Sequence, residues 1–184
     1  MAVSLGPDLS MRALARELGV GVSTLYYYVQ SREELVSLVA DRVLEELRLQ
    51  LDDPRHWRPA MLRSGHALRQ LFGSRVAMAE NAMQDPQWGD TIITLHEEAC
   101  DFLVRAGFSP GRAFLAVRAI ADLVEAHTLR THHHHRVGHG DLELASGAPG
   151  HHPTLDRAWR ELGPELPEQR FEFALRSLVR GMTP

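Results

Sequence analysis

Cationic, hydroxyl-bearing and aromatic side chains gather in one short stretch of the chain, residues 10–32. The stretch holds Arg12, Arg16 and Arg32 against a single acidic residue, Glu17. Guanidinium groups bind phosphates and can form two hydrogen bonds with guanine, while hydroxyl groups suit phosphate oxygens. The net charge of the whole chain, −4, argues against a protein that coats nucleic acid generally, but it permits local binding by this stretch.

The same stretch has the pattern of two short helices joined by a tight turn. The hydroxyl of Ser10 is suited to cap the first helix, and Gly19 stands where a left-handed residue can end it without steric cost. The apolar residues expected inside recur at helical spacing and are Leu14, Ala15, Leu18, Val20, Leu25 and Val29. This spacing is typical of a helix-turn-helix, whose second helix enters the DNA major groove, although any helical hairpin could share it.

Two segments decide between these interpretations. They are residues 24–29, TLYYYV, and residues 31–35, SREEL. Over residues 9–38 the sequence resembles the start of tetracycline-repressor (TetR) family regulators, in which a recognition helix with this ending precedes a polar step into the next helix. The resemblance implies an all-α transcriptional regulator with a DNA-binding helix-turn-helix and a helical ligand-binding and dimerisation bundle.

The resemblance also implies which side chains face DNA. Arg12, at the front of the first helix, would lie beside the major groove, and Arg32 stands where the family has a phosphate-binding cation. The residues implied in DNA binding are Arg12, Val22, Ser23, Thr24, Tyr26, Tyr27, Tyr28 and Arg32. Three successive residues span about 200° of a helix, so the three tyrosines cannot all face one way, and the alternative for one ring is to pack inside.

Residues 1–9 are too short for a helix and are interrupted by Gly6 and Pro7. Family members carry a first helix of about a dozen residues ahead of this point, whose apolar face covers Leu14, Leu18 and Leu25. We therefore expect that the first helix is absent from this polypeptide or that the start codon was assigned too late. In the second case, in-frame translation of the upstream DNA would yield an amphipathic helix.

Apolar stripes at helical spacing fill the rest of the chain, and no segment alternates with a period of two, so the expected class is all-α. Ser31 and Glu34 form a capping-box pattern that opens a helix running to about Leu49, which would link the two parts of the protein. Further helical segments are expected at 57–72, 76–83, 92–106, 110–130, 153–162 and 167–182. The chain would thus divide into a DNA-binding domain with its linker helix, residues 1–48, and an effector-binding and dimerisation domain, residues 49–184.

A small-molecule effector would bind among the inward faces of the helices between residues 57 and 130. Candidate pocket residues are Met61, Met78, Met83, Trp88, His96, Phe102, Asp122 and Glu125. Methionine and aromatic stripes at helical spacing are more often plain core than ligand-binding surface. The tetracycline-binding member of the family has a magnesium-ligand histidine where this chain has Met78 or a neighbour. That chemistry therefore does not transfer, the effector stays unidentified, and no cofactor is expected.

Residues 131–152 hold seven of the eleven histidines, together with five glycines or prolines. Imidazoles are common metal ligands, so one alternative function is a histidine-loop metal-binding protein with a vestigial DNA-binding head. The histidine spacing matches no known zinc pattern. We expect a polar, mobile, metal-free loop between two helices.

Composition and spacing limit the remaining classes. No serine, histidine or aspartate lies at a catalytic spacing, so the chain is not expected to be an enzyme. The single Cys100 excludes a disulfide framework and fits a reducing cytoplasm, and we find neither a signal-peptide pattern nor an apolar run of membrane-spanning length. The expected location is therefore the cytoplasm.

The resemblance implies a homodimer through the helices at 110–130 and 167–182. The last helix carries both Phe171 and Phe173 and is apolar over a broad arc, as expected for a helix packed on its own core and on a partner. A wholly intramolecular core would look alike. The predicted function is a one-component repressor that binds a near-palindromic operator and is released by a small molecule.

Overall fold

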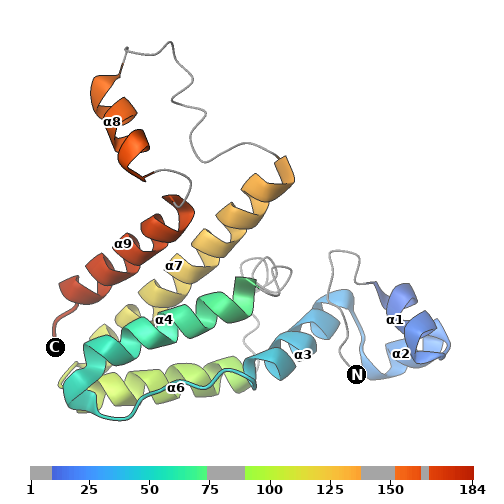
Figure 1. Ribbon diagram of the computed structural model, residues 1–184. Helices are drawn as coiled ribbons and strands as arrows, with labels where there is room; N and C mark the ends of the chain where they lie inside the picture. The colour runs from blue at the N-terminus through green and yellow to red at the C-terminus, as the bar shows by residue number, and fades with distance from the viewer. Residues whose placement is uncertain (1–9, 74–89, 138–151, 163–165) are drawn as a thin grey trace.

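The computed structural model of the chain describes residues 10–73, 90–137, 152–162 and 166–184. Within these residues every regular element is a helix, so the expected all-α class is confirmed. The helices are α1 (Met11–Leu18), α2 (Val22–Tyr28), α3 (Arg32–Leu44), the 3-10 turn η1 (Pro54–His56), α4 (Trp57–Gly73), α6 (Asp90–Arg105), α7 (Pro110–Val137), α8 (Pro153–Leu162) and α9 (Leu166–Gly181). Figure 1 shows α1 and α2 at one end of α3, and α4, α6, α7 and α9 packed together at its other end. We call residues 10–35 the head and the four packed helices the body.

The head is held by helix caps and a small apolar cluster. The Oγ of Ser10 accepts a hydrogen bond from the backbone nitrogen of Ala13 at 3.2 Å, and Gly19 is left-handed with φ +67°. The buried cluster consists of Met11, Leu14, Ala15, Leu25, Val29 and Leu35. The expectation that Leu18 and Val20 also lie inside is wrong, since they are 46% and 42% exposed. Two helices of eight and seven residues offer too little surface to cover them.

α3 joins the head to the body. Its first turn has the predicted cap: the Oγ of Ser31 accepts a hydrogen bond from the backbone nitrogen of Glu34 at 3.0 Å. In return, Oε2 of Glu34 accepts a hydrogen bond from the backbone nitrogen of Gln30 at 2.6 Å. Leu35 belongs to the head cluster and Leu44 to the body core, so one helix takes part in both. α3 ends earlier than predicted because tighter backbone hydrogen bonds, of three-residue span, follow Leu44.

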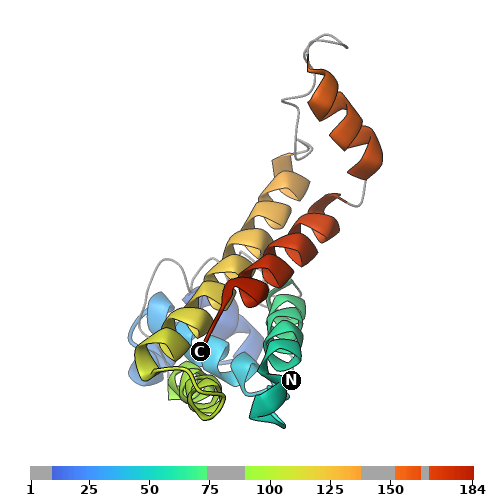
Figure 2. The same cartoon turned by 90° about the vertical axis from the view of Figure 1, so that its left-hand side faces the viewer.

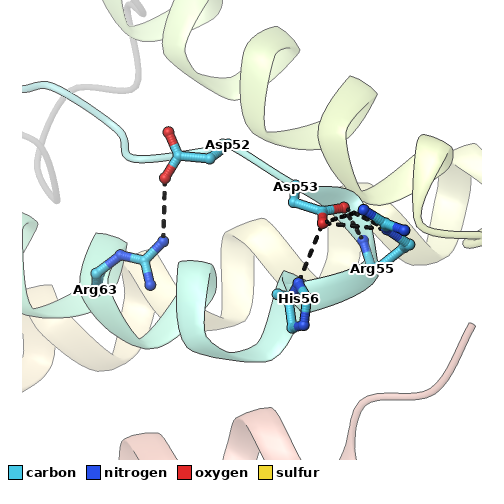
Figure 3. Close-up of polar contacts among 5 residues, drawn as sticks. All are labelled: Asp52, Asp53, Arg55, His56 and Arg63. Carbon is cyan, nitrogen blue, oxygen red and sulfur yellow. Dashed lines mark hydrogen bonds and ion pairs between the residues drawn. The ribbon is translucent and has the colours of Figure 1, made fainter.

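Polar contacts fix the segment between α3 and α4 (Figure 3). Asp53 accepts a hydrogen bond from the backbone nitrogen of Arg55 at 3.0 Å, and its carboxylate also contacts the guanidinium of Arg55 and the ring of His56. Hydrogen bonds from Arg55 hold the pKa of Asp53 well below its usual range. Arg63 of α4 reaches back to Asp52, 3.7 Å away. These contacts set the direction in which α4 leaves the linker.

α7 is the central helix of the body and packs against α4, α6 and α9. The largest fully buried side chains come from all four helices and are Met61, Phe102, Leu103, Val124, Phe171, Leu175 and Val179. Gly65 of α4 permits a close approach of α9, because a Cβ at Gly65 would lie 2.9 Å from a methyl carbon of Leu175. Figures 1 and 2 both show α9 running beside α7.

α7 continues further than predicted. The expected loop began at Thr131, but the helix runs to Val137 and includes His132 and the three histidines that follow it. Histidine is tolerated in helices, and the five glycines and prolines of the histidine-rich segment all come after Val137. The loop prediction is therefore wrong for its first seven residues. The following stretch, with His139 and His151, lies outside the described residues.

The helices predicted at 57–72, 92–106, 153–162 and 167–182 match α4, α6, α8 and α9 within two residues at each end. The segment predicted at 76–83 lies outside the described residues. Both views show α8 standing away from the rest of the body (Figures 1 and 2). In the part of the chain that the structure describes, no helix combines the length and apolar character needed to cross a membrane.

Candidate DNA-binding surface and ligand cavity

The helix-turn-helix of the head exposes nearly all of the side chains predicted to face DNA. Those that are described and exposed are Arg12, Val22, Ser23, Thr24, Tyr26, Tyr27 and Tyr28. Arg12 projects from the second position of α1, and the others project from α2, in which only Leu25 is buried. The backbone of Arg32 opens α3, but its side chain lies outside the described part of the structure.

All three tyrosines of α2 point outward, so the alternative in which one ring packs inside does not hold. Tyr26 is 49% exposed and Tyr27 is 83% exposed. The rings of Tyr27 and Tyr28 meet edge to face, with their centroids 5.3 Å apart. Because α2 has only seven residues and is anchored by Leu25, most of its circumference stays in solvent. The tyrosine hydroxyls are thereby free to contact a partner.

The charge of this surface fits a polyanion. Arg12 and Arg16 extend from α1, are exposed, and form no ion pair with any residue that the structure describes. The hydroxyl groups of Ser23 and Thr24 are exposed at the start of α2. Cations and hydroxyls on the exposed side of one helix-turn-helix are the groups that proteins use on phosphates and on base edges.

A partly open cavity of about 80 Å³ lies in the body, lined by the end of α3 and its following turn, α4, α6 and α7. Its lining residues are Leu44, Leu47, Leu49, Met61, Ser64, Leu68, Phe72, Ile92, Leu95, His96, Ala99, Val117, Ile120, Ala121 and Glu125. We call this space the inner cavity. Its wall is almost entirely apolar, which is typical of a site for an organic ligand.

Three of the predicted pocket residues, Met61, His96 and Glu125, line the inner cavity. Phe102 and Asp122 do not line it: Phe102 is fully buried in the core, and the exposed side chain of Asp122 pairs with Arg118 on the outside of α7. Leu95, His96 and Ala99 of α6 line the cavity. Phe102 belongs instead to the core cluster. The remaining candidates, Met78, Met83 and Trp88, lie outside the described residues.

Sequence analysis missed the contribution of α3 and its following turn to the inner cavity. Leu44, Leu47 and Leu49 all line it. The apolar stripe of the linker helix was visible in the sequence, but it was assigned only to the connection between head and body. The apolar stripe of the linker helix continues past the last residue that the head can cover. That continuation could have indicated a contact with the body.

The two titratable groups that line the inner cavity are both disfavoured in their charged forms. Nδ1 of His96 lies 2.8 Å from the carbonyl oxygen of Ile92, and burial lowers the pKa of His96. Burial also raises the pKa of Glu125, which is only 8% exposed. The Nδ1 contact is that of a donor, so the neutral imidazole carries its proton there. The cavity therefore holds a neutral histidine and a carboxyl group that resists ionisation.

A second space, an open cleft of about 560 Å³, lies between α4 and α7. Its lining residues are His66, Arg69, Gln70, Gly73, His127, Thr128, Thr131 and His132. Arg69 pairs with Glu168, and Nε2 of His66 lies 3.0 Å from the carboxylate of Glu172, so both side chains contact α9. In the described ranges no group of three or more histidine, cysteine or carboxylate side chains is arranged to hold a metal ion. The cleft gives the metal-binding alternative no support.

Comparison with known proteins agrees with the head and the body. The family model for the tetracyclin repressor-like C-terminal domain matches residues 51–184, and that for bacterial regulatory proteins of the tetR family matches residues 6–39. The chain belongs to the TetR family. Members of this family are regulators rather than enzymes, in keeping with the absence of a catalytic spacing in the sequence.

Individual relatives of this TetR-family chain are about a quarter identical to it over the aligned residues. An HTH-type transcriptional regulator from Saccharopolyspora erythraea is 28% identical over 117 residues, which are 64% of this chain and 50% of that protein. An HTH-type transcriptional repressor from Mycobacterium tuberculosis is 27% identical over 126 residues, 65% of this chain and 40% of that protein. The chain thus spans half or less of the length of these relatives.

Solved structures from Streptomyces coelicolor have the same fold. A possible TetR family transcriptional regulator covers 97% of this chain and 90% of its own, with 25% identity and a TM-score of 0.78. The TetR family protein ActR, crystallised in complex with actinorhodin, covers 95% of this chain and 87% of its own, with 25% identity and a TM-score of 0.75. The fold is therefore shared with a TetR family protein that has been crystallised with a small molecule.

Proposed function

We propose that this TetR-family regulator is a one-component repressor that binds operator DNA as a homodimer and is released by a small molecule in the inner cavity. The observation that carries the proposal is the exposed surface of α1 and α2, which presents cations, hydroxyls and aromatic rings, while Leu25 is the one buried residue of α2. The repressor from M. tuberculosis and the ligand complex of ActR support the two halves of the proposal. We further propose a cytoplasmic location and a division at residue 48 between a DNA-binding domain and an effector-binding and dimerisation domain.

The test of DNA binding begins with selection of bound sequences from a random duplex library. Arg12→Ala should then weaken binding to the selected sequence by about 1–3 kcal/mol and relax the preference at one base pair, because it removes a base-edge contact. The control is Arg105→Ala, which removes an arginine of the body that pairs with Asp101. Equal binding of selected and random DNA, or an unchanged base preference in Arg12→Ala, would show that α1 and α2 do not read sequence.

Arg32 is proposed to contact phosphate rather than a base. Arg32→Ala should weaken binding to every sequence alike and reduce the dependence of log K on log salt by about one, because one fewer counterion is released. The measurement is fluorescence anisotropy of labelled duplexes at a series of salt concentrations. A change in base preference without a change in salt slope would contradict the assignment.

The proposed dimer interface uses the helical segments at 110–130 and 167–182. α7 exposes Phe114 and Leu115, the latter at 68%, and α9 exposes Phe173 at 76%. Large apolar side chains held in solvent on neighbouring helices are typical of an interface between subunits. Phe171, by contrast, is buried in the body core, so the two phenylalanines of α9 divide between the core and the proposed partner.

Light scattering at micromolar concentration tests the dimer. The wild-type chain should give about twice its monomer mass of 20.7 kDa. Phe173→Glu should give the monomer mass, because it places a charge in the apolar interface, while Phe173→Leu should keep the dimer. A wild-type mass equal to the monomer would refute the interface.

A further inference from the structure

The inner cavity contains one feature that its apolar wall does not explain, the carboxyl group of Glu125. The side chain projects from α7, is more than nine-tenths buried and lines the cavity. It forms no hydrogen bond or ion pair with any residue that the structure describes. A buried carboxyl group without a partner is unfavourable, and natural proteins rarely keep one unless something else satisfies it.

Among the residues that the structure describes, no cation forms an ion pair with Glu125. Arg118, on the same helix, partly offsets the effect of burial on the pKa of Glu125, but its guanidinium is bound to Asp122, one turn away from Glu125. His96 faces the cavity from α6, and its lowered pKa keeps it neutral. The cavity residues contributed by α3 and its following turn and by α4 carry no charge. Within the described residues an ionised Glu125 therefore has no directly bound counter-ion, which a ligand could supply.

We propose that the inner cavity binds the protonated amine of a small hydrophobic molecule, with Glu125 as its counter-ion and the apolar wall around its hydrocarbon part. This assignment rests on the proposed function, because it takes the inner cavity as the effector site. An ammonium group donates hydrogen bonds to the carboxylate and neutralises it, which is the combination that a buried acid needs. An anionic ligand fits less well than an amine, since it would place a second negative charge beside an ionised Glu125.

The size of the cavity selects the probe. At about 80 Å³ the cavity is small, so the probe is a short alkyl amine whose ammonium end can reach Glu125. Suitable probes are n-butylammonium, 1-butanol and butyrate, which have similar hydrocarbon parts and differ in charge. Binding is followed on the full chain by NMR of ¹³C-methyl methionine, because Met61 lines the cavity. The signal of Met61 is assigned with Met61→Leu.

The expected order of affinity is n-butylammonium, then 1-butanol, then butyrate. Glu125→Gln should weaken n-butylammonium by about tenfold or more, the usual range for a hydrogen bond to a charged group, while 1-butanol changes by less than about twofold. The matched control is Glu98→Gln, an exposed carboxylate of α6 outside the cavity. It should leave all three affinities unchanged.

Two results would overturn the assignment. One is butyrate binding as tightly as n-butylammonium to the wild-type chain, a comparison that does not require any variant to fold. The other is an equal affinity of n-butylammonium for the wild type and for folded Glu125→Gln. Operator release is measured separately: n-butylammonium that binds at Glu125 without weakening DNA binding would refute the effector role of the cavity and support the counter-ion role of Glu125.

Discussion

Gly65 offers the sharpest test of how the body is packed. Gly65→Ala adds a Cβ that would lie 2.9 and 3.0 Å from the two Cδ atoms of Leu175 and 3.4 Å from Cγ2 of Ile120. Leu175 is fully buried, so its side chain cannot turn away into solvent. Overpacking of this kind costs about 1–3 kcal/mol. Replacing glycine by alanine within a helix stabilises the helix by roughly 1 kcal/mol, which offsets part of this cost. The free energy of unfolding of the variant should therefore be lower than that of the wild type by about 1 kcal/mol.

The control for Gly65→Ala is Gly111→Ala, in the first turn of α7, where a Cβ would meet no atom within 4 Å. This control should be neutral or stabilising by no more than about 1 kcal/mol. The assay is urea unfolding followed by circular dichroism, at one protein concentration so that dimerisation does not differ between variants. The free energies of unfolding of the two variants should therefore differ by about 1–3 kcal/mol.

A double-mutant cycle shows whether Leu175 is the cause. Leu175→Ala alone should cost about 2–5 kcal/mol because it leaves a cavity. In the Gly65→Ala background the cost should be smaller, with a coupling of about 0.5–3 kcal/mol, because the new methyl group occupies part of that space. Additive effects, or a Gly65→Ala variant as stable as Gly111→Ala, would refute the close approach of α4 and α9.

Three further outcomes are expected. Burial raises the pKa of Glu125 in the folded protein, so the native wild type binds more protons than the unfolded chain and loses stability as the pH rises through the ordinary glutamate pKa. Glu125→Gln should therefore gain stability relative to the wild type over that rise and lose the gain in acid. Unfolding curves at a series of pH values measure this difference. Ser31→Ala should lower the free energy of unfolding by about 1 kcal/mol by removing the cap of α3, while the exposed Ser177→Ala should change it by less than about 0.5 kcal/mol. Burial raises the pKa of the Cys100 thiol, so iodoacetamide should modify it several-fold more slowly in the native protein than in urea, as mass spectrometry would show.

Local signals predicted the helix ends of the head well. Ser10 and Ser31 cap the two helices at which their hydroxyls were expected, and Gly19 takes the left-handed conformation that its position indicated. Each of these outcomes depends on a few neighbouring residues. The exposure of Leu18 depends instead on how much surface the rest of the head provides, which local spacing does not reveal.

The end of α7 was missed because composition was averaged over too long a window. The histidines up to residue 135 precede the first glycine of that segment, Gly138, and the helix ends at Val137. Of the residues that the sequence selected for an effector pocket, His96 and Glu125 line the inner cavity, whereas Phe102 of α6 fills the core. Whether a residue of α6 lines the cavity or fills the core depends on how the helix is rotated about its axis, and that rotation is set by packing between helices.

α3 takes part in both hydrophobic clusters, and this has a thermodynamic consequence. Its 13 residues form a rod of about 20 Å, with Leu35 in the head cluster and Leu44 in the wall of the inner cavity. If a ligand binds more tightly in one orientation of α3, it must also favour the position of the head that goes with that orientation. Linkage is reciprocal, so operator DNA that favours the other position must weaken the ligand by the same factor by which the ligand weakens DNA. The affinity of n-butylammonium measured with and without saturating operator would therefore give the strength of regulation without any measurement of transcription.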